Sequence, residues 1–82
     1  MTAVGIDVGK ANLDVAVDGR QGVTRYANSR SGITKLVKWL KGLDAPRIVV
    51  EATGGYEEQV LEACCDAQLW SCRVNPRQAR NF

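Results

Sequence analysis

Apolar residues in the first third of the chain follow the short period that is typical of β-strands. A run of apolar and small residues over 3–8 predicts a strand buried on both faces, and strict alternation over 13–17 predicts a second strand. Asp18-Gly19 is a hairpin signal, and a third strand is predicted over 22–27. Because short turns join these strands, we expect an antiparallel meander.

The period then changes to that of helices separated by strands. Apolar residues between 33 and 40 recur at i, i+3, i+4 and i+7 and predict a helix, with Ser29 or Ser31 as its cap. Further elements are predicted over 47–51 (strand), 56–67 (helix) and 69–74 (strand). The order β-β-β-α-β-α-β predicts an α/β domain with a mixed sheet, because right-handed β-α-β units add parallel strands to the meander.

The second helix is expected to bury one apolar face and to carry acidic residues in its first turn. The buried face is expected to comprise Tyr56, Val60, Leu61 and Cys64, and the acidic residues are Glu57 and Glu58. Negative charge in the first turn is favoured by the helix dipole.

The cysteine and histidine counts exclude several kinds of site. The three cysteines, Cys64, Cys65 and Cys72, are too few and wrongly spaced for a disulfide framework or a zinc site, and we expect all three to be buried and reduced. The chain has no histidine, which excludes Ser-His-Asp and Cys-His catalysis within these residues.

Length and composition indicate one small soluble domain over residues 1–82, with 45% hydrophobic and 24% charged residues. Apolar runs are far shorter than the roughly 20 residues of a membrane span, and no signal peptide is evident, so we expect a cytoplasmic protein without a membrane partner. A net charge of +2 does not by itself indicate nucleic-acid binding.

Two carboxylates occur where apolar strands end. Asp7 lies near the end of the first strand and Glu51 ends the fourth. If those strands are parallel neighbours, both side chains emerge at the edge where open α/β sheets place their ligands. Neighbouring carboxylates repel one another unless a cation lies between them, and hard oxygen ligands favour Mg²⁺ or Mn²⁺. Small residues nearby leave room for an ion or a phosphate: Ala3, Gly5, Gly9, Gly54 and Gly55.

Other interpretations of these acids are open at this point. Asp7 could accept hydrogen bonds from the next turn, and Glu51 could cap the following helix or pair with Lys10. Asp14 is expected on the face of its strand away from the apolar alternation, and Asp18 in a turn. We do not expect either of these two aspartates to bind metal.

Three blocks of the sequence carry a resemblance to a known family. They are GIDVGKANLDVAV (5–17), IVVEATGGYEEQV (48–60) and VNPRQARNF (74–82). Together and in this order they resemble the N-terminal domain of DEDD-type transposases, a group that includes the Piv/MooV DNA invertases and the insertion-sequence recombinases guided by a bridge RNA. The resemblance spans the whole chain and implies a RuvC-like, RNase H-like fold, truncated at its C-terminus and belonging to a longer transposase.

The resemblance also implies chemistry for particular residues. Asp7 and Glu51 match two of the four acidic residues that bind Mg²⁺ (or Mn²⁺) in this family, and the other two belong to a D-x-x-D motif expected beyond residue 82. The longer transposase to which these residues would belong, called the parent below, would cleave and exchange DNA strands in transposition or inversion. The chain alone, with half of the ligands, is expected to bind metal weakly or not at all and to be inactive.

The partners expected for the parent are DNA, a guide RNA and further copies of itself in a homo-oligomer. Basic side chains are expected to contact the phosphate backbone of the nucleic acid. These residues are Lys10, Arg73, Arg77 and Arg80.

Two alternative functions belong to other classes. An actin-like or sugar-kinase-like ATPase also begins with a GIDVG strand and a hairpin, but such proteins place Thr or Ser after the glycine, where this chain has Lys10-Ala11. A non-catalytic RNase H-like module that only binds nucleic acid or a partner is the second alternative.

Overall fold

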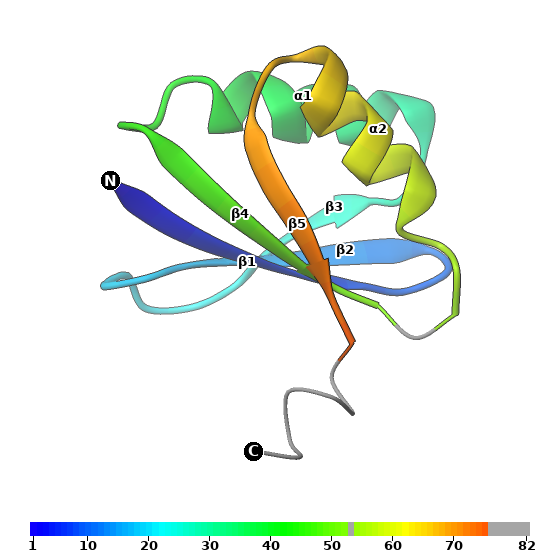
Figure 1. Ribbon diagram of the computed structural model, residues 1–82. Helices are drawn as coiled ribbons and strands as arrows, with labels where there is room; N and C mark the ends of the chain where they lie inside the picture. Colours follow the sequence, from blue (N-terminus) through cyan, green and yellow to red (C-terminus); the bar gives the residue numbers. More distant parts are fainter. Residues whose placement is uncertain (53, 76–82) are drawn as a thin grey trace.

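The computed structural model describes residues 1–52 and 54–75 (Figure 1). Five strands and two helices follow one another in the predicted order. Their bounds are β1 Thr2–Val8, β2 Asn12–Val17, β3 Thr24–Ala27, α1 Arg30–Leu40, β4 Pro46–Glu51, α2 Glu58–Asp66 and β5 Trp70–Val74. Each element lies within a few residues of its predicted position.

The strands form one mixed sheet in the order β3-β2-β1-β4-β5. The first three make the predicted antiparallel meander, and β4 and β5 add to it in parallel. Both helices lie over the same face of the sheet (Figure 1). This is an α/β arrangement consistent with an RNase H-like fold.

The core lies between the sheet and the two helices. Alternate strand residues point into it, together with the apolar stripes of α1 and α2. Its fully buried members include Ile6, Leu13, Leu36, Ile48 and Val60. Burial of each such side chain stabilises the fold by about 1.5–3 kcal/mol relative to leaving it in water.

The prediction that the first strand is buried on both faces is wrong. Val4 and Ile6 are buried, but Gly5 and Asp7 alternate with them and are exposed. No helix of the described residues covers that second face (Figure 1). The apolar appearance of β1 arises because its open face carries small residues before Asp7, so alternation is hidden.

The predicted start of α1 is confirmed in detail. Ser29 is the cap residue, and its hydroxyl accepts a hydrogen bond from the Gly32 backbone N–H at 3.2 Å. A side chain at Gly32 would overlap the backbone carbonyl oxygen of Ala27 at the end of β3. The glycine therefore allows the helix to begin directly against the strand that precedes it.

The predicted start of α2 and part of its buried face are wrong. The helix begins at Glu58, so Tyr56 lies in a turn before it and is 48% exposed. Glu57 is instead buried, with 3% of its surface exposed. Val60 and Cys64 form the buried face as predicted, and Leu61 is partly buried.

Only one of the cysteines is fully buried. Cys64 is buried, Cys72 is half-buried and Cys65 is exposed, and all three thiols are free. Burial raises the pKa of the Cys64 thiol to about 11. The expectation of three buried cysteines is therefore wrong for Cys65, which lies on the outer side of α2. Within the described residues, neither helix is long and apolar enough to cross a membrane.

Candidate metal centre

Asp7 and Glu51 occupy paired positions on neighbouring parallel strands. Asp7 of β1 is the register partner of Glu51 of β4. Both side chains are exposed on the face of the sheet that the helices leave open. Paired positions on adjacent strands place β-carbons roughly 5 Å apart, which is close enough for two carboxylates to share one ion.

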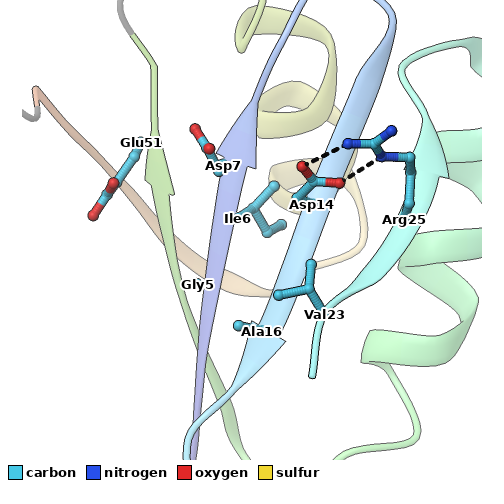
Figure 2. Close-up of a pocket in the computed structure, with 8 residues that line it drawn as sticks. All are labelled: Gly5, Ile6, Asp7, Asp14, Ala16, Val23, Arg25 and Glu51. Atoms are coloured by element: carbon cyan, nitrogen blue, oxygen red, sulfur yellow. Dashed lines mark hydrogen bonds and ion pairs between the residues drawn. The ribbon is translucent and has the colours of Figure 1, made fainter. Parts of the chain in front are cut away.

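The same register continues across the meander. Asp14 of β2 is the partner of Asp7, and Arg25 of β3 is the partner of Asp14. Arg25, Asp14, Asp7 and Glu51 thus form one row across four strands, which we call the carboxylate row (Figure 2).

Asp14 is held by its neighbour in this row. Arg25 donates from Nε to Oδ1 at 2.8 Å and from Nη2 to Oδ2 at 3.1 Å, so both carboxylate oxygens are engaged. These hydrogen bonds hold the pKa of Asp14 below its usual value, and the same contact raises the pKa of Arg25. Asp14 is therefore engaged in an ion pair with Arg25 through both of its oxygens.

Asp7 and Glu51 have no such partner. Neither carboxylate makes a hydrogen bond or ion pair with any residue in 1–52 or 54–75, so the pairing with Lys10 considered from the sequence is not formed. Both therefore present hard oxygen donors to solvent at one point of the sheet.

These residues fit part of the shell of a divalent ion. Two adjacent, unpaired carboxylates suit Mg²⁺ or Mn²⁺ in ligand type and charge. Within the described residues no group of three or more Cys, Asp or Glu side chains could hold an ion. The remaining ligands of such an ion would therefore have to be water, substrate or residues outside the described part.

A shallow groove of about 570 Å³ follows the carboxylate row on the open face. Its floor is formed by two small residues, Gly5 and Ala16. They are register partners on β1 and β2, each two residues from the paired Asp7 and Asp14. Figure 2 shows the charged side chains rising from successive strands beside this floor. The expected room next to Asp7 is therefore present, and at Gly5 a β-carbon would meet no atom within 4 Å.

A side-chain amide fixes the loops next to the carboxylate row. Asn28, just after β3, donates from Nδ2 to the carbonyl oxygens of Gly9 at 2.9 Å and Tyr56 at 3.1 Å. The turn after β1 and the segment that leads from β4 into α2 are thereby held to the same residue. This anchors the chain beyond both strand ends from which Asp7 and Glu51 project.

The structure describes two of the four predicted nucleic-acid-binding residues and places them apart. Lys10 is exposed in the turn after β1, near the carboxyl ends of the strands. Arg73 pairs in register with the buried Val50 and contacts Glu57, so it lies on the helix-covered face, away from Asp7 and Glu51. Arg77 and Arg80 lie outside the described residues.

Sequence reasoning missed two charged pairs. Arg25 was not singled out, although its pairing with Asp14 follows from the hairpin register once the loop length between β2 and β3 is known. The buried Glu57, whose Oε1 lies 3.7 Å from Arg73 Nη1, had no sequence signal. An acidic residue beside a helix start is ordinarily exposed, and only the tertiary packing of α2 on β5 buries this one.

Comparisons with known proteins indicate which structures and which family this chain resembles. A search of curated proteins found no match. Two solved structures are similar: the Aquifex aeolicus member of the Ppx/GppA protein family (14% identity, 95% of this chain, TM-score 0.47) and the type II variant of the Aquifex aeolicus Ppx/GppA phosphatase (13%, 93%, 0.46). The chain spans 36% of the length of each, and at these scores the likeness carries no argument about activity.

One family model matches almost the whole chain. It is the DEDD transposase family of IS110 type, described as a transposase, and the match runs over residues 4–82. The matched region contains both Asp7 and Glu51 and all of the strands and helices except the first two residues of β1. The resemblance found in the three sequence blocks is thereby confirmed, and the chain belongs to the DEDD transposase family of IS110 type.

Proposed function

We propose that residues 1–82 are the N-terminal part of the catalytic domain of a longer DNA transposase, and that Asp7 and Glu51 hold a Mg²⁺ or Mn²⁺ ion for DNA strand cleavage and exchange. The observation that carries the proposal is the register pairing, on adjacent parallel strands, of two carboxylates that have no partner among the described residues. Family membership supports DNA as the substrate and favours this function over the ATPase alternative.

Each residue has a specific role in this proposal. Asp7 and Glu51 would bind the ion from two neighbouring strands, whose parallel hydrogen-bonded ladder fixes their separation. When bound, the ion supplies charge stabilisation at the scissile phosphate and activates the attacking group. The sheet beneath is rigid because Val4, Ile6, Ile48 and Val50 are buried against the helices, which keeps the two carboxylates from moving apart.

The open face gives the DNA strand its approach to these acids. The groove beside Asp7 has a floor of small residues, so a sugar-phosphate backbone can come close to the carboxylates. Lys10, exposed in the turn after Asp7, is proposed to contact phosphate there. The full-length transposase is further proposed to bind a guide RNA and to act as a homo-oligomer.

The 82-residue chain is proposed to be inactive by itself. It supplies two carboxylates, and the described residues contain no third acidic or thiol group placed to join them on one ion. Strand cleavage of this type uses two ions about 3.5–4 Å apart, which two carboxylates cannot hold in place.

The test uses the full-length transposase and the DNA that it cleaves. Asp7→Asn and Glu51→Gln should each lower Mg²⁺-dependent cleavage by at least about a hundredfold, because several kcal/mol of transition-state stabilisation depend on the ion. Asp66→Asn and Glu62→Gln, the same changes at exposed positions of α2, serve as controls and should leave the rate unchanged. Circular dichroism would show that all four variants are folded. Cleavage at the wild-type rate by Asp7→Asn would refute the proposal.

A further inference from the structure

The Arg25–Asp14 pair lies in the carboxylate row and has no role in the function proposed above. Arg25 ends the row on β3, two strands from Asp7, and points into the same groove as the acids (Figure 2). Its side chain is 64% exposed, so a ligand in the groove can reach it.

The charge of the groove makes this arginine important for an anionic substrate. Among the described residues that line the groove, three are acidic (Asp7, Asp14 and Glu51) and Arg25 is the one that carries positive charge. Without Arg25, the charged side chains that line this groove in the described part would all be carboxylates. Arg25 is therefore the cationic side chain of this groove itself, whereas Lys10 lies in the turn after β1 and Arg20 lines the adjoining hollow beside Gly5 and Ala16.

The geometry of the pair fixes how the guanidinium is presented. The bonds to Asp14 use Nε and Nη2, so they set the plane of the guanidinium and take no N–H from Nη1. An arginine anchored in this fork-like manner loses less rotamer freedom when it binds a phosphate than a free side chain does. Asp14 thereby acts as a positioning residue for Arg25.

We propose that Arg25, oriented by Asp14, binds a non-scissile phosphate of the DNA strand whose scissile phosphate lies at Asp7 and Glu51. This inference rests on the proposed function of those two acids. A guanidinium between β2 and β3 lies two strand spacings, roughly 10 Å, from an ion between β1 and β4. Because a DNA strand winds around the helix axis while it rises about 3.4 Å per nucleotide, its neighbouring phosphates are roughly 6–7 Å apart, so the contacted phosphate is one or two nucleotides from the cleaved one.

The experiment is a methylphosphonate scan with the full-length protein on the DNA that it cleaves, with the cleaved bond mapped first on the wild type. Each methylphosphonate removes the charge of one phosphate, and binding is measured in Ca²⁺ by fluorescence anisotropy. One substitution, one or two nucleotides from the cleaved bond, should weaken wild-type binding about tenfold, as expected for a hydrogen bond to a charged group. The same methylphosphonate should weaken DNA binding by the Arg25→Gln protein less than about twofold, because that protein already lacks the contact.

Variants of Arg25 and Asp14 test whether this one contact accounts for the sensitive position. On unmodified DNA, Arg25→Gln should reduce the slope of log affinity against log salt by about 0.9, the value for one phosphate contact. Arg30→Gln, the same change on α1 over the opposite face, should leave both the slope and the scan unchanged. Arg25→Lys should keep part of the sensitivity to the methylphosphonate. Asp14→Asn should reduce that sensitivity without abolishing it, because the guanidinium keeps one of its two anchors.

Several outcomes would overturn the inference. A wild-type scan without a sensitive position one or two nucleotides from the cleaved bond would do so, as would equal sensitivity of the wild type and Arg25→Gln. In either case Mg²⁺-dependent cleavage that requires Asp7 would leave the proposed function standing. A full-length protein that cleaves no DNA would instead overturn both, and the pair would then serve only to join β2 to β3.

Discussion

Asp7 on β1 and Glu51 on β4 stand opposite one another at the same register position of two parallel strands, and neither has a partner in the described part of the chain. Two like charges at directly paired positions destabilise a sheet. An arrangement of this kind is maintained at a cost to stability unless a cation is bound, and that cost leads to a first prediction.

In metal-free buffer near neutral pH, Asp7→Asn should raise the free energy of unfolding of the 82-residue chain by roughly 0.2–1 kcal/mol, because one of two like charges at paired strand positions is removed. Because a site of two carboxylates is weak, Mg²⁺ should raise the melting temperature of the wild type only at high concentration, and it should not raise that of the variant. Thermal denaturation followed by circular dichroism measures both effects. A variant less stable than the wild type without metal would indicate that Asp7 has a structural role.

The shared edge at which these two acids lie could be predicted because it depends on local patterns. Apolar runs located the ends of β1 and β4, and the right-handed crossover through α1 required the two strands to run in parallel. A carboxylate at the end of each strand then had to appear at one edge of the sheet. Register to the residue was not predictable, since it depends on how the sheet packs against the helices.

The burial of individual faces could not be predicted. The small residues on the open face of β1, such as Gly5, look the same in the sequence whether they are covered or exposed. The burial of Glu57 and the exposure of Tyr56 depend on where α2 begins, and a shift of two residues in that boundary exchanges their environments. Helix boundaries are set by tertiary contacts that the pattern of the helix itself does not contain.

A second prediction concerns the buried Glu57. Its Oε1 lies 3.7 Å from Arg73 Nη1, and its Oε2 has no hydrogen-bond partner in the described part. Arg73→Gln should lower the free energy of unfolding by about 1–3 kcal/mol, because a buried carboxylate then loses its counter-ion. Urea denaturation measures this, with Arg30→Gln as the matched control. If Arg73→Gln and Arg30→Gln are equally stable, the ion pair does not support the packing of α2 on β5.

A third prediction compares two glycines. Gly32→Ala places a methyl group against the backbone carbonyl of Ala27 and should destabilise the chain by about 1–3 kcal/mol, although alanine normally favours a helix. Gly5→Ala meets open space and should stabilise β1 by roughly 0.5–1 kcal/mol. Chemical denaturation of both variants gives the two signs directly. A stabilising Gly32→Ala would mean that α1 does not begin against the end of β3.

A fourth prediction is a loss of stability at alkaline pH. The Cys64 thiol has its pKa raised from 9.0 to about 11 by burial, so the folded state keeps a proton that the unfolded state releases. Stability from this group is fully present below pH 9 and falls as the pH rises toward 11. The decrease in unfolding free energy over this range should be larger for the wild type than for Cys64→Ala by at least about 1 kcal/mol. Identical pH profiles would show that Cys64 ionises freely in the folded state.

The central claim is that Asp7 and Glu51 together hold the catalytic ion. Binding of Mn²⁺ to the full-length protein, measured by electron paramagnetic resonance of the free ion, tests it most directly. Asp7→Asn and Glu51→Gln should each weaken binding by at least about tenfold, because the number of charged ligands sets the affinity. Asp14→Asn should bind Mn²⁺ almost as the wild type does, because Arg25 already occupies both oxygens of that carboxylate. Unchanged Mn²⁺ affinity in Asp7→Asn and Glu51→Gln would contradict the account.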